Sequence, residues 1–128
     1  MGLFKAKDKN RINGGFISDT IIGLTLNLIG QTKDQAVQFL GNADFYENVT
    51  KEGALSLTTM LKNKCVLGIS LEKGIVFKVN IWLNHKPSKE DVENLHLFYA
   101  THEDEYYYII THNESTGKYV IAFESRLY

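Results

Sequence analysis

The side chains with the widest chemical range in this sequence are its histidines: His85, His96, His102 and His112. His96 and His102 are six residues apart, so they lie on different sides of a helix, unlike the i, i+4 pair of a zinc-binding helix. The run His102-Glu103-Asp104 contains possible metal ligands, but solvated polar residues at a helix end are the simpler interpretation. We expect no metal and no other cofactor.

The carboxylates and serines do not form a catalytic pattern either. The pairs Glu90 with Asp91 and Glu103 with Glu105 fall in predicted helix caps and charge runs, which are poor positions for acid–base catalysis. The sequence contains no zinc-helix, Cys-x-x-Cys, nucleophile-elbow or phosphate-binding glycine motif. We therefore expect no enzyme; an unfamiliar one would need two or three of the histidines to converge in space.

Composition narrows the class of protein. The chain has 128 residues, a formal net charge of −1 and 44% hydrophobic residues, which fits one globular domain. A nucleic-acid-binding protein would carry many uncompensated basic residues, so we expect no nucleic-acid partner. The single cysteine, Cys65, excludes an intramolecular disulfide and lies in an apolar strand pattern, which favours an inert core thiol.

The sequence also predicts the domain organisation of the chain and its cellular location. Residues 1–15 read as a flexible basic arm, and residues 16–128 as a single α+β domain. No apolar run reaches the ~20 residues of a membrane span. The basic segment Met1 to Arg11 is not followed by the apolar region of a signal peptide. We expect a cytoplasmic protein with no membrane partner.

Several independent signals predict a short helix that begins after Thr32 and ends at Gly41. Thr32 and Gln35 have the spacing of a capping box, and glycine commonly ends helices. Its apolar stripe is Ala36, Val37, Phe39 and Leu40. The preceding segment, 16–29, fits both a strand and a helix, and we narrowly favour the helix. Residues 42–53 read as a polar connection.

Alternation predicts three consecutive strands with one apolar face. The residues of the apolar face are Leu55, Leu57, Thr59 and Leu61 in the first strand, Cys65, Leu67, Ile69 and Leu71 in the second, and Phe77, Val79, Ile81 and Leu83 in the third. Glu72-Lys73-Gly74 closes the last two strands into a hairpin, with Gly74 at positive φ.

A second helix is predicted after His85-Lys86-Pro87, with Ser88 as its N-cap. One side of it carries Val92, Leu95, Phe98 and Tyr99. A terminal hairpin follows, from Tyr106 to His112 and from Tyr119 to Glu124. The predicted fold class is α+β, an antiparallel sheet formed by the meander and the C-terminal hairpin, with two or three helices on one face.

The first helix also carries a family resemblance, on the run Ile29-Gly-Gln-Thr-Lys-Asp-Gln-Ala-Val-Gln-Phe-Leu-Gly-Asn-Ala-Asp44. It resembles the pattern G-x-T-x-x-x-V-x-x-x-L-G-x-P-D of β-lactamase-inhibitor-protein-like domains and of the small lipoprotein of the outer-membrane barrel-assembly machinery. Val37 stands one position late and Ala43 replaces the proline. The resemblance implies a non-enzymatic protein that binds other proteins, in several cases as an inhibitor. The lipoprotein role needs a lipidated cysteine after a signal peptide, and we do not expect it.

One candidate binding surface is the second face of the meander. Residues that alternate with the apolar set are Ser56, Thr58, Met60, Val66, Gly68, Ser70, Val76, Lys78, Asn80 and Trp82. Tryptophan is enriched at interface hot spots, so we assign partner binding to Trp82 with Lys78, Asn80 and Met60. The alternative is that the terminal hairpin or the N-terminal segment covers Trp82 and Val76.

The second candidate is the acidic and aromatic run Glu103-Asp104-Glu105-Tyr106-Tyr107-Tyr108. We expect Tyr106 and Tyr108 to point outward and Tyr107 inward, so that three acids and two tyrosines could dock on a basic partner surface. The alternative is an ordinary strand after a solvated helix end.

Together these patterns predict a protein-binding domain whose sharpest form is an immunity-type inhibitor that neutralises a bacterial toxin or enzyme. The alternative is a small-ligand-binding or regulatory module with an apolar pocket between the sheet and a helix. The sequence leaves the identity of the partner, the biological process and the oligomeric state open.

Overall fold

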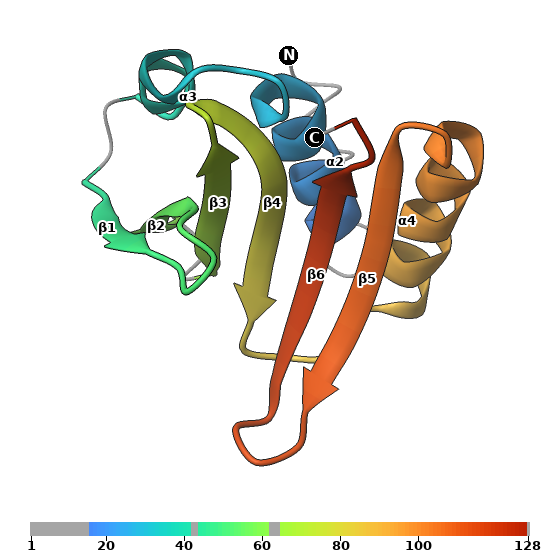
Figure 1. Cartoon of the computed structure of the whole chain (residues 1–128). Coiled ribbons are helices and arrows are strands. Elements are labelled where there is room, and N and C mark those ends of the chain that lie inside the picture. The colour runs from blue at the N-terminus through green and yellow to red at the C-terminus, as the bar shows by residue number, and fades with distance from the viewer. Residues whose placement is uncertain (1–15, 42–43, 62–64, 128) are drawn as a thin grey trace.

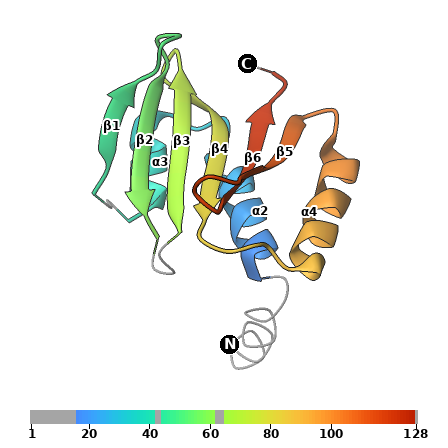
Figure 2. The same ribbon diagram turned by 90° about the horizontal axis from the view of Figure 1, so that it is seen from below.

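The computed structural model describes residues 16–41, 44–61 and 65–127 and confirms the predicted α+β class. An antiparallel sheet of six strands carries three helices in these ranges, and the helices pack on one face of the sheet (Figures 1 and 2). The predicted basic arm, 1–15, lies outside the described residues. No helix of the described part is long and apolar enough to cross a membrane.

The chain begins its described part with two helices and a four-stranded meander. Their bounds are α2 Phe16–Leu28, α3 Lys33–Phe39, β1 Tyr46–Val49, β2 Leu55–Met60, β3 Val66–Glu72 and β4 Ile75–Leu83. The rest of the fold is α4 Lys89–His102, β5 Tyr106–Asn113 and β6 Lys118–Ser125. The strand order is β1-β2-β3-β4-β6-β5, so the last strand inserts beside β4 and leaves β5 at the edge.

The ambiguous segment 16–29 is largely helix, as narrowly favoured. Helix α2 buries Ile17, Ile21, Leu24 and Leu28, whose spacing of three and four residues forms one helical stripe. An extended strand would have turned two of these side chains to each face.

Asp91 joins the starts of α2 and α4. Its carboxylate accepts a hydrogen bond from the Ser18 backbone N–H at 2.8 Å and another from the Ser88 hydroxyl at 3.0 Å. The Ser88 hydroxyl in turn accepts from the Asp91 N–H at 3.0 Å, which confirms Ser88 as the N-cap of α4. Because Ser18 lies in the first turn of α2, a buried acid from α4 caps a second helix.

Helix α3 has the predicted capping box. The Thr32 hydroxyl accepts from the Gln35 N–H at 3.3 Å, and the Gln35 side chain accepts from the Thr32 N–H at 2.9 Å. The predicted stripe is wrong at Phe39, which is 50% exposed, while Ala36 is buried. Strand β1 follows where only a polar connection was expected. Its Glu47 carboxylate pairs with the Lys33 ammonium at 2.6 Å, which ties this short strand to α3.

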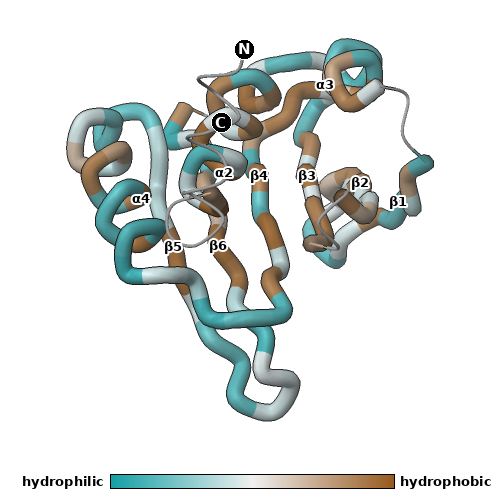
Figure 3. Tube along the Cα trace, turned by 180° about the vertical axis from the view of Figure 1, so that it is seen from behind, coloured by the Kyte–Doolittle hydropathy of each residue, from teal (hydrophilic) through white to brown (hydrophobic). Residues whose placement is uncertain are grey.

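The core lies between the helices and the inner face of the sheet. Its fully buried side chains include Ile21, Leu28, Leu57, Leu67, Ile69, Val79, Ile81, Leu83, Leu95, Ile121 and Phe123. Hydrophobic segments (brown) alternate with polar ones along the central strands, whereas the turn between β5 and β6 is hydrophilic to neutral (teal to white, Figure 3). Cys65 is buried as expected, and burial raises the pKa of its thiol.

The predicted inner face is wrong at one point on β4. Ser70 pairs with Lys78, but the next residue of β3, Leu71, pairs with Val76, so Phe77 is an extra residue in a β-bulge. Val76 is therefore buried, and Phe77 is turned out of the core and only half-buried. Simple alternation fails here because it assumes an unbroken pleat.

Candidate functional site

The open face of the sheet, opposite the helices, carries an apolar row at the end where β4 ends (the lower end in Figure 1). We use "apolar row" for four directly paired positions on β2, β3, β4 and β6: Met60, Val66, Trp82 and Val120. Met60 is 68% exposed and the other three are half-buried. Cross-strand neighbours on one face contact each other, so the row forms a continuous apolar strip.

Polarity increases along the strands away from this row. The middle row is Tyr46, Thr58, Gly68, Asn80, Ala122 and Ile109, and the polar row beyond it is Asn48, Ser56, Ser70, Lys78, Glu124 and Tyr107. Tyr46 is 71% exposed and Ile109 is also exposed, so large apolar side chains reach solvent at both sides of the middle row.

The ring of Trp82 extends from the apolar row over Gly68, which has no side chain to occupy that space. A Cβ atom on Gly68 would lie 2.7 and 2.8 Å from two ring carbons of Trp82 and 2.5 Å from the Asn80 side-chain oxygen. Real Cβ atoms do not approach other atoms so closely, so the indole occupies the space above Gly68. Trp82 is therefore a surface side chain that the sheet supports from below.

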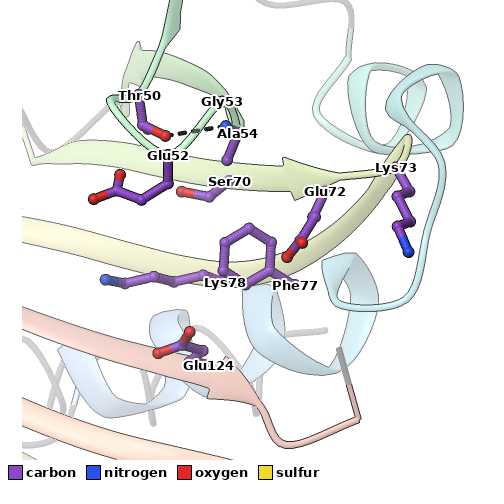
Figure 4. A pocket seen from close by; sticks show the side chains of 10 residues that line it. All are labelled: Thr50, Glu52, Gly53, Ala54, Ser70, Glu72, Lys73, Phe77, Lys78 and Glu124. Atoms are coloured by element: carbon purple, nitrogen blue, oxygen red, sulfur yellow. Dashed lines mark hydrogen bonds between the residues drawn. The ribbon is translucent and has the colours of Figure 1, made fainter.

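A groove of about 620 Å³ lies at the polar end of the open face (Figure 4). The β1–β2 turn forms one wall, and the Thr50 hydroxyl accepts a hydrogen bond from the Ala54 N–H at 3.0 Å in that turn. Phe77, which the bulge turns outward, and Lys78 lie in the groove. The lining carries three carboxylates and two ammonium groups: Glu52, Glu72, Glu124, Lys73 and Lys78. Such a mixture suits the charged and aromatic side chains of a protein surface.

The structure brings four sequence-predicted residues together on the open face: Trp82, Lys78, Asn80 and Met60. Val76, expected beside them, is in the core. Phe77 was not predicted on this face because no sequence signal marks the bulge. Tyr46 and Ile109 were not predicted either, because neither β1 nor the place of β5 in the sheet was expected.

The acidic and aromatic run is only partly as predicted. Glu103, Asp104 and Glu105 are exposed after α4. The orientation of the tyrosines is the reverse of the prediction: Tyr107 is 48% exposed, whereas Tyr106 and Tyr108 face the helices. The ring of Tyr108 stacks on Phe123 at 5.0 Å, and the ring of Tyr106 lies 6.1 Å from that of Phe98. Pairing with β6 causes this, because Tyr106 and Tyr108 stand opposite Ser125 and the buried Phe123.

Burial changes the acidity of these inward tyrosines. It raises the pKa of Tyr108 to about 12 and, together with a smaller contribution from the Glu105 carboxylate, raises the pKa of Tyr106. Neither phenol is a free docking group, so both are removed from the candidate site.

Arg126 was not predicted to take part, yet it contacts the first residues of β5. Its guanidinium carbon lies 3.9 Å from the centroid of the Tyr107 ring. Its Nε donates to the Tyr106 carbonyl at 3.2 Å and its Nη2 donates to the Tyr99 hydroxyl at 3.3 Å. This cation also borders the shallow hollow lined by Glu103 and Asp104, so the acidic run has a positive neighbour.

The histidines do not form a common site. His85, His96 and His112 are exposed, and His102 stacks on Phe98 with ring centroids 4.1 Å apart. Within the described ranges, no group of three or more histidine, cysteine, aspartate or glutamate side chains could hold a metal ion.

Comparison with known proteins adds no identification: no family model, curated protein or solved structure matches this chain. The resemblance of the run from Ile29 to Asp44 to inhibitor-type domains therefore stays a prediction, and the proposed function rests on the geometry of the open face.

Proposed function

We propose that this protein is a non-enzymatic domain that binds another protein through the open face of its sheet. The observation that carries the proposal is Trp82, supported above Gly68 and placed in the apolar row with the exposed Met60. A rigidly supported indole buries much area in a complex and loses little conformational entropy, which is the property of a binding hot spot.

The surroundings of the apolar row fit the same use. Protein interfaces have an apolar centre and a polar rim, and here Asn80 borders Trp82 while Lys78 and Glu124 lie one row further. All three described helices pack on the other face, so they leave this surface open to a partner (Figure 2).

The more specific form of the proposal is an immunity-type inhibitor that neutralises a toxin or enzyme. It is supported by the family resemblance and by exposed carboxylates at two places, the groove with Glu52 and the run Glu103-Asp104-Glu105. Carboxylates at the rim would attract a basic active cleft and raise the rate of association.

Affinity capture with matched variants tests the binding face. Met60→Glu places a charge in the apolar row, and Leu97→Glu places the same charge on α4, where Leu97 is 64% exposed in the helical layer. Both side chains are exposed, so both variants should keep the thermal stability of the wild type within about 0.5 kcal/mol. We expect a stoichiometric partner that Met60→Glu loses and Leu97→Glu retains. A partner retained by Met60→Glu, or no partner at all, contradicts the proposal.

A small-ligand-binding module is the second candidate, and the groove with Phe77 is the observation that favours it. The groove lies on the open face, not between sheet and helix as the sequence-based alternative expected. A ligand that raises the melting temperature of the wild type but not of Phe77→Ala would support this candidate.

A further inference from the structure

We infer that the edge strand β5 pairs with β5 of a second copy of this chain, so that two sheets join into one antiparallel sheet. The surface is the edge of Tyr106–Asn113 with which no other described strand pairs, and its occupant is the same strand related by a two-fold axis. This inference concerns self-association and stands independently of the proposed partner of the open face.

The two edges of the sheet differ in protection. Strand β1 has four residues, and its Glu47 is fixed to Lys33 of α3, so this edge is short and charged. Strand β5 has eight residues, Tyr-Tyr-Tyr-Ile-Ile-Thr-His-Asn, without aspartate, glutamate, lysine, arginine, proline or glycine. Its pairing with β6 runs in one unbroken register. Sheet edges are normally protected by a lysine, a proline, a bulge or a covering helix. Strand β5 has no lysine, proline or bulge, and α4 contacts it from the helix face, where Tyr99 lies beside Tyr108.

The hydrogen-bond register shows which backbone groups face outward. The Arg126 N–H donates to the Glu105 carbonyl at 2.8 Å, so Glu105 and Arg126 form a hydrogen-bonded pair. Such pairs alternate along antiparallel strands, so Tyr106, Tyr108, Ile110 and His112 turn their N–H and C=O groups away from β6. The Tyr106 carbonyl accepts from Arg126 instead, which agrees with this assignment.

Apolar side chains flank this edge on both faces. Ile109 is exposed on the open face. On the helix face Tyr99 of α4 lies beside Tyr108, with ring centroids 5.5 Å apart, so this side of α4 faces β5. Val92 lies two helical turns before Tyr99 on the same side and is exposed. A second copy would therefore bury apolar surface on both sides of the new ladder.

A two-fold axis at Ile110 gives a register without like-charge contacts. Ile110 then faces Ile110 of the second copy, and Tyr108 faces His112 of the second copy. At each end Tyr106, whose carbonyl holds Arg126, lies opposite Glu114 of the second copy. The strand itself is uncharged. The two-fold axis places Arg126 of each copy near Glu114 of the other copy, so the edge is complementary to itself.

Two measurements on the purified chain test the inference. The first is amide hydrogen exchange of the wild type, which needs no variant. In the dimer the outward amides of Tyr108, Ile110 and His112 should be as protected as the inward amides of Tyr107, Ile109 and Thr111. Fast exchange at the outward amides at a concentration of about 0.5 mM, with slow exchange at the inward ones, overturns the inference.

The second measurement is sedimentation equilibrium of two variants that add one lysine each. Ile109→Lys charges the β5 edge, and Val49→Lys charges the β1 edge, where Val49 is exposed. We expect the wild type and Val49→Lys to dimerise, and Ile109→Lys to raise the dissociation constant at least tenfold. A monomeric wild type, or equal dissociation constants for both variants, contradicts the inference. Both measurements use the purified chain without a partner protein. A negative result would therefore overturn the dimer but would not bear on the proposed function of the open face.

Discussion

The ring of Trp82 lies over the bare backbone of Gly68 on the neighbouring strand. Gly68 stands directly opposite Asn80, so Trp82 reaches it diagonally across the ladder. A glycine within a strand leaves a gap on the sheet surface, and an aromatic side chain on the adjacent strand can fill that gap. The pair thus fixes the orientation of the indole while one side of the ring stays available to a partner.

A side chain at position 68 should displace the indole. For Gly68→Ala we expect the free energy of unfolding to fall by about 1–3 kcal/mol, because the new methyl group overlaps the Trp82 ring and Asn80. Trp82 is the only tryptophan, so its emission should shift to longer wavelength. Urea denaturation and fluorescence measure both effects.

Gly23→Ala is the control for that substitution. A Cβ at Gly23 meets nothing within 4 Å, and alanine is favoured in a helix, so stability should stay equal or rise by up to about 1 kcal/mol. Unchanged stability and emission in Gly68→Ala would show that the indole does not depend on Gly68.

Removal of the Asp91 carboxylate should uncouple α2 from α4. Asp91→Ala leaves the Ser18 N–H and the Ser88 hydroxyl without their acceptor, so we expect a loss of about 1–3 kcal/mol in the free energy of unfolding. Glu90→Ala changes the neighbouring exposed acid and should cost less than about 0.5 kcal/mol. Equal effects of the two substitutions in thermal unfolding would refute the cap between the helices.

The Tyr108 hydroxyl is buried and has no hydrogen-bond partner among the described residues. Tyr108→Phe keeps the ring stacked on Phe123 and removes the unpaired hydroxyl, so the free energy of unfolding should rise by about 1 kcal/mol. Tyr107→Phe changes an exposed phenol and should be neutral. A destabilised Tyr108→Phe in urea denaturation would mean that the hydroxyl has a partner.

The same residue should make the fold sensitive to alkali. The pKa of Tyr108 is about 12 in the folded protein against an ordinary value of 10.0, so the unfolded chain loses this proton first. Ionisation of Tyr108 therefore leaves the free energy of unfolding unchanged below about pH 10 and lowers it progressively as the pH rises towards 12. Melting temperatures from pH 9 to pH 12 should fall less steeply for Tyr108→Phe, and identical slopes would argue against a buried phenol.

Local signals in the sequence predicted much of this fold. The Thr32–Gln35 capping box, the Ser88 cap and the turn at Gly74 depend on contacts within a few residues, so the sequence contains them directly. The alternation on β2 and β3 predicted the inner face because these strands keep an unbroken pleat.

Features that depend on which strands pair, and in which register, could not be predicted from the sequence. The bulge at Phe77, the orientation of Tyr106 and Tyr108 and the insertion of β6 between β4 and β5 are set by registers between distant segments. No local pattern specifies these registers. Met60, Lys78, Asn80 and Trp82 of the candidate site were found because they alternate with core residues, whereas the groove required the bulge.

The most direct test of the open face is fluorine NMR of the chain labelled with 5-fluorotryptophan, to which the captured partner is added. Trp82 is the only tryptophan, so one resonance reports on the apolar row of this face. We predict that this resonance shifts or broadens until one equivalent of partner is bound. A partner that binds at one equivalent and leaves the Trp82 resonance unchanged would contradict binding through the open face.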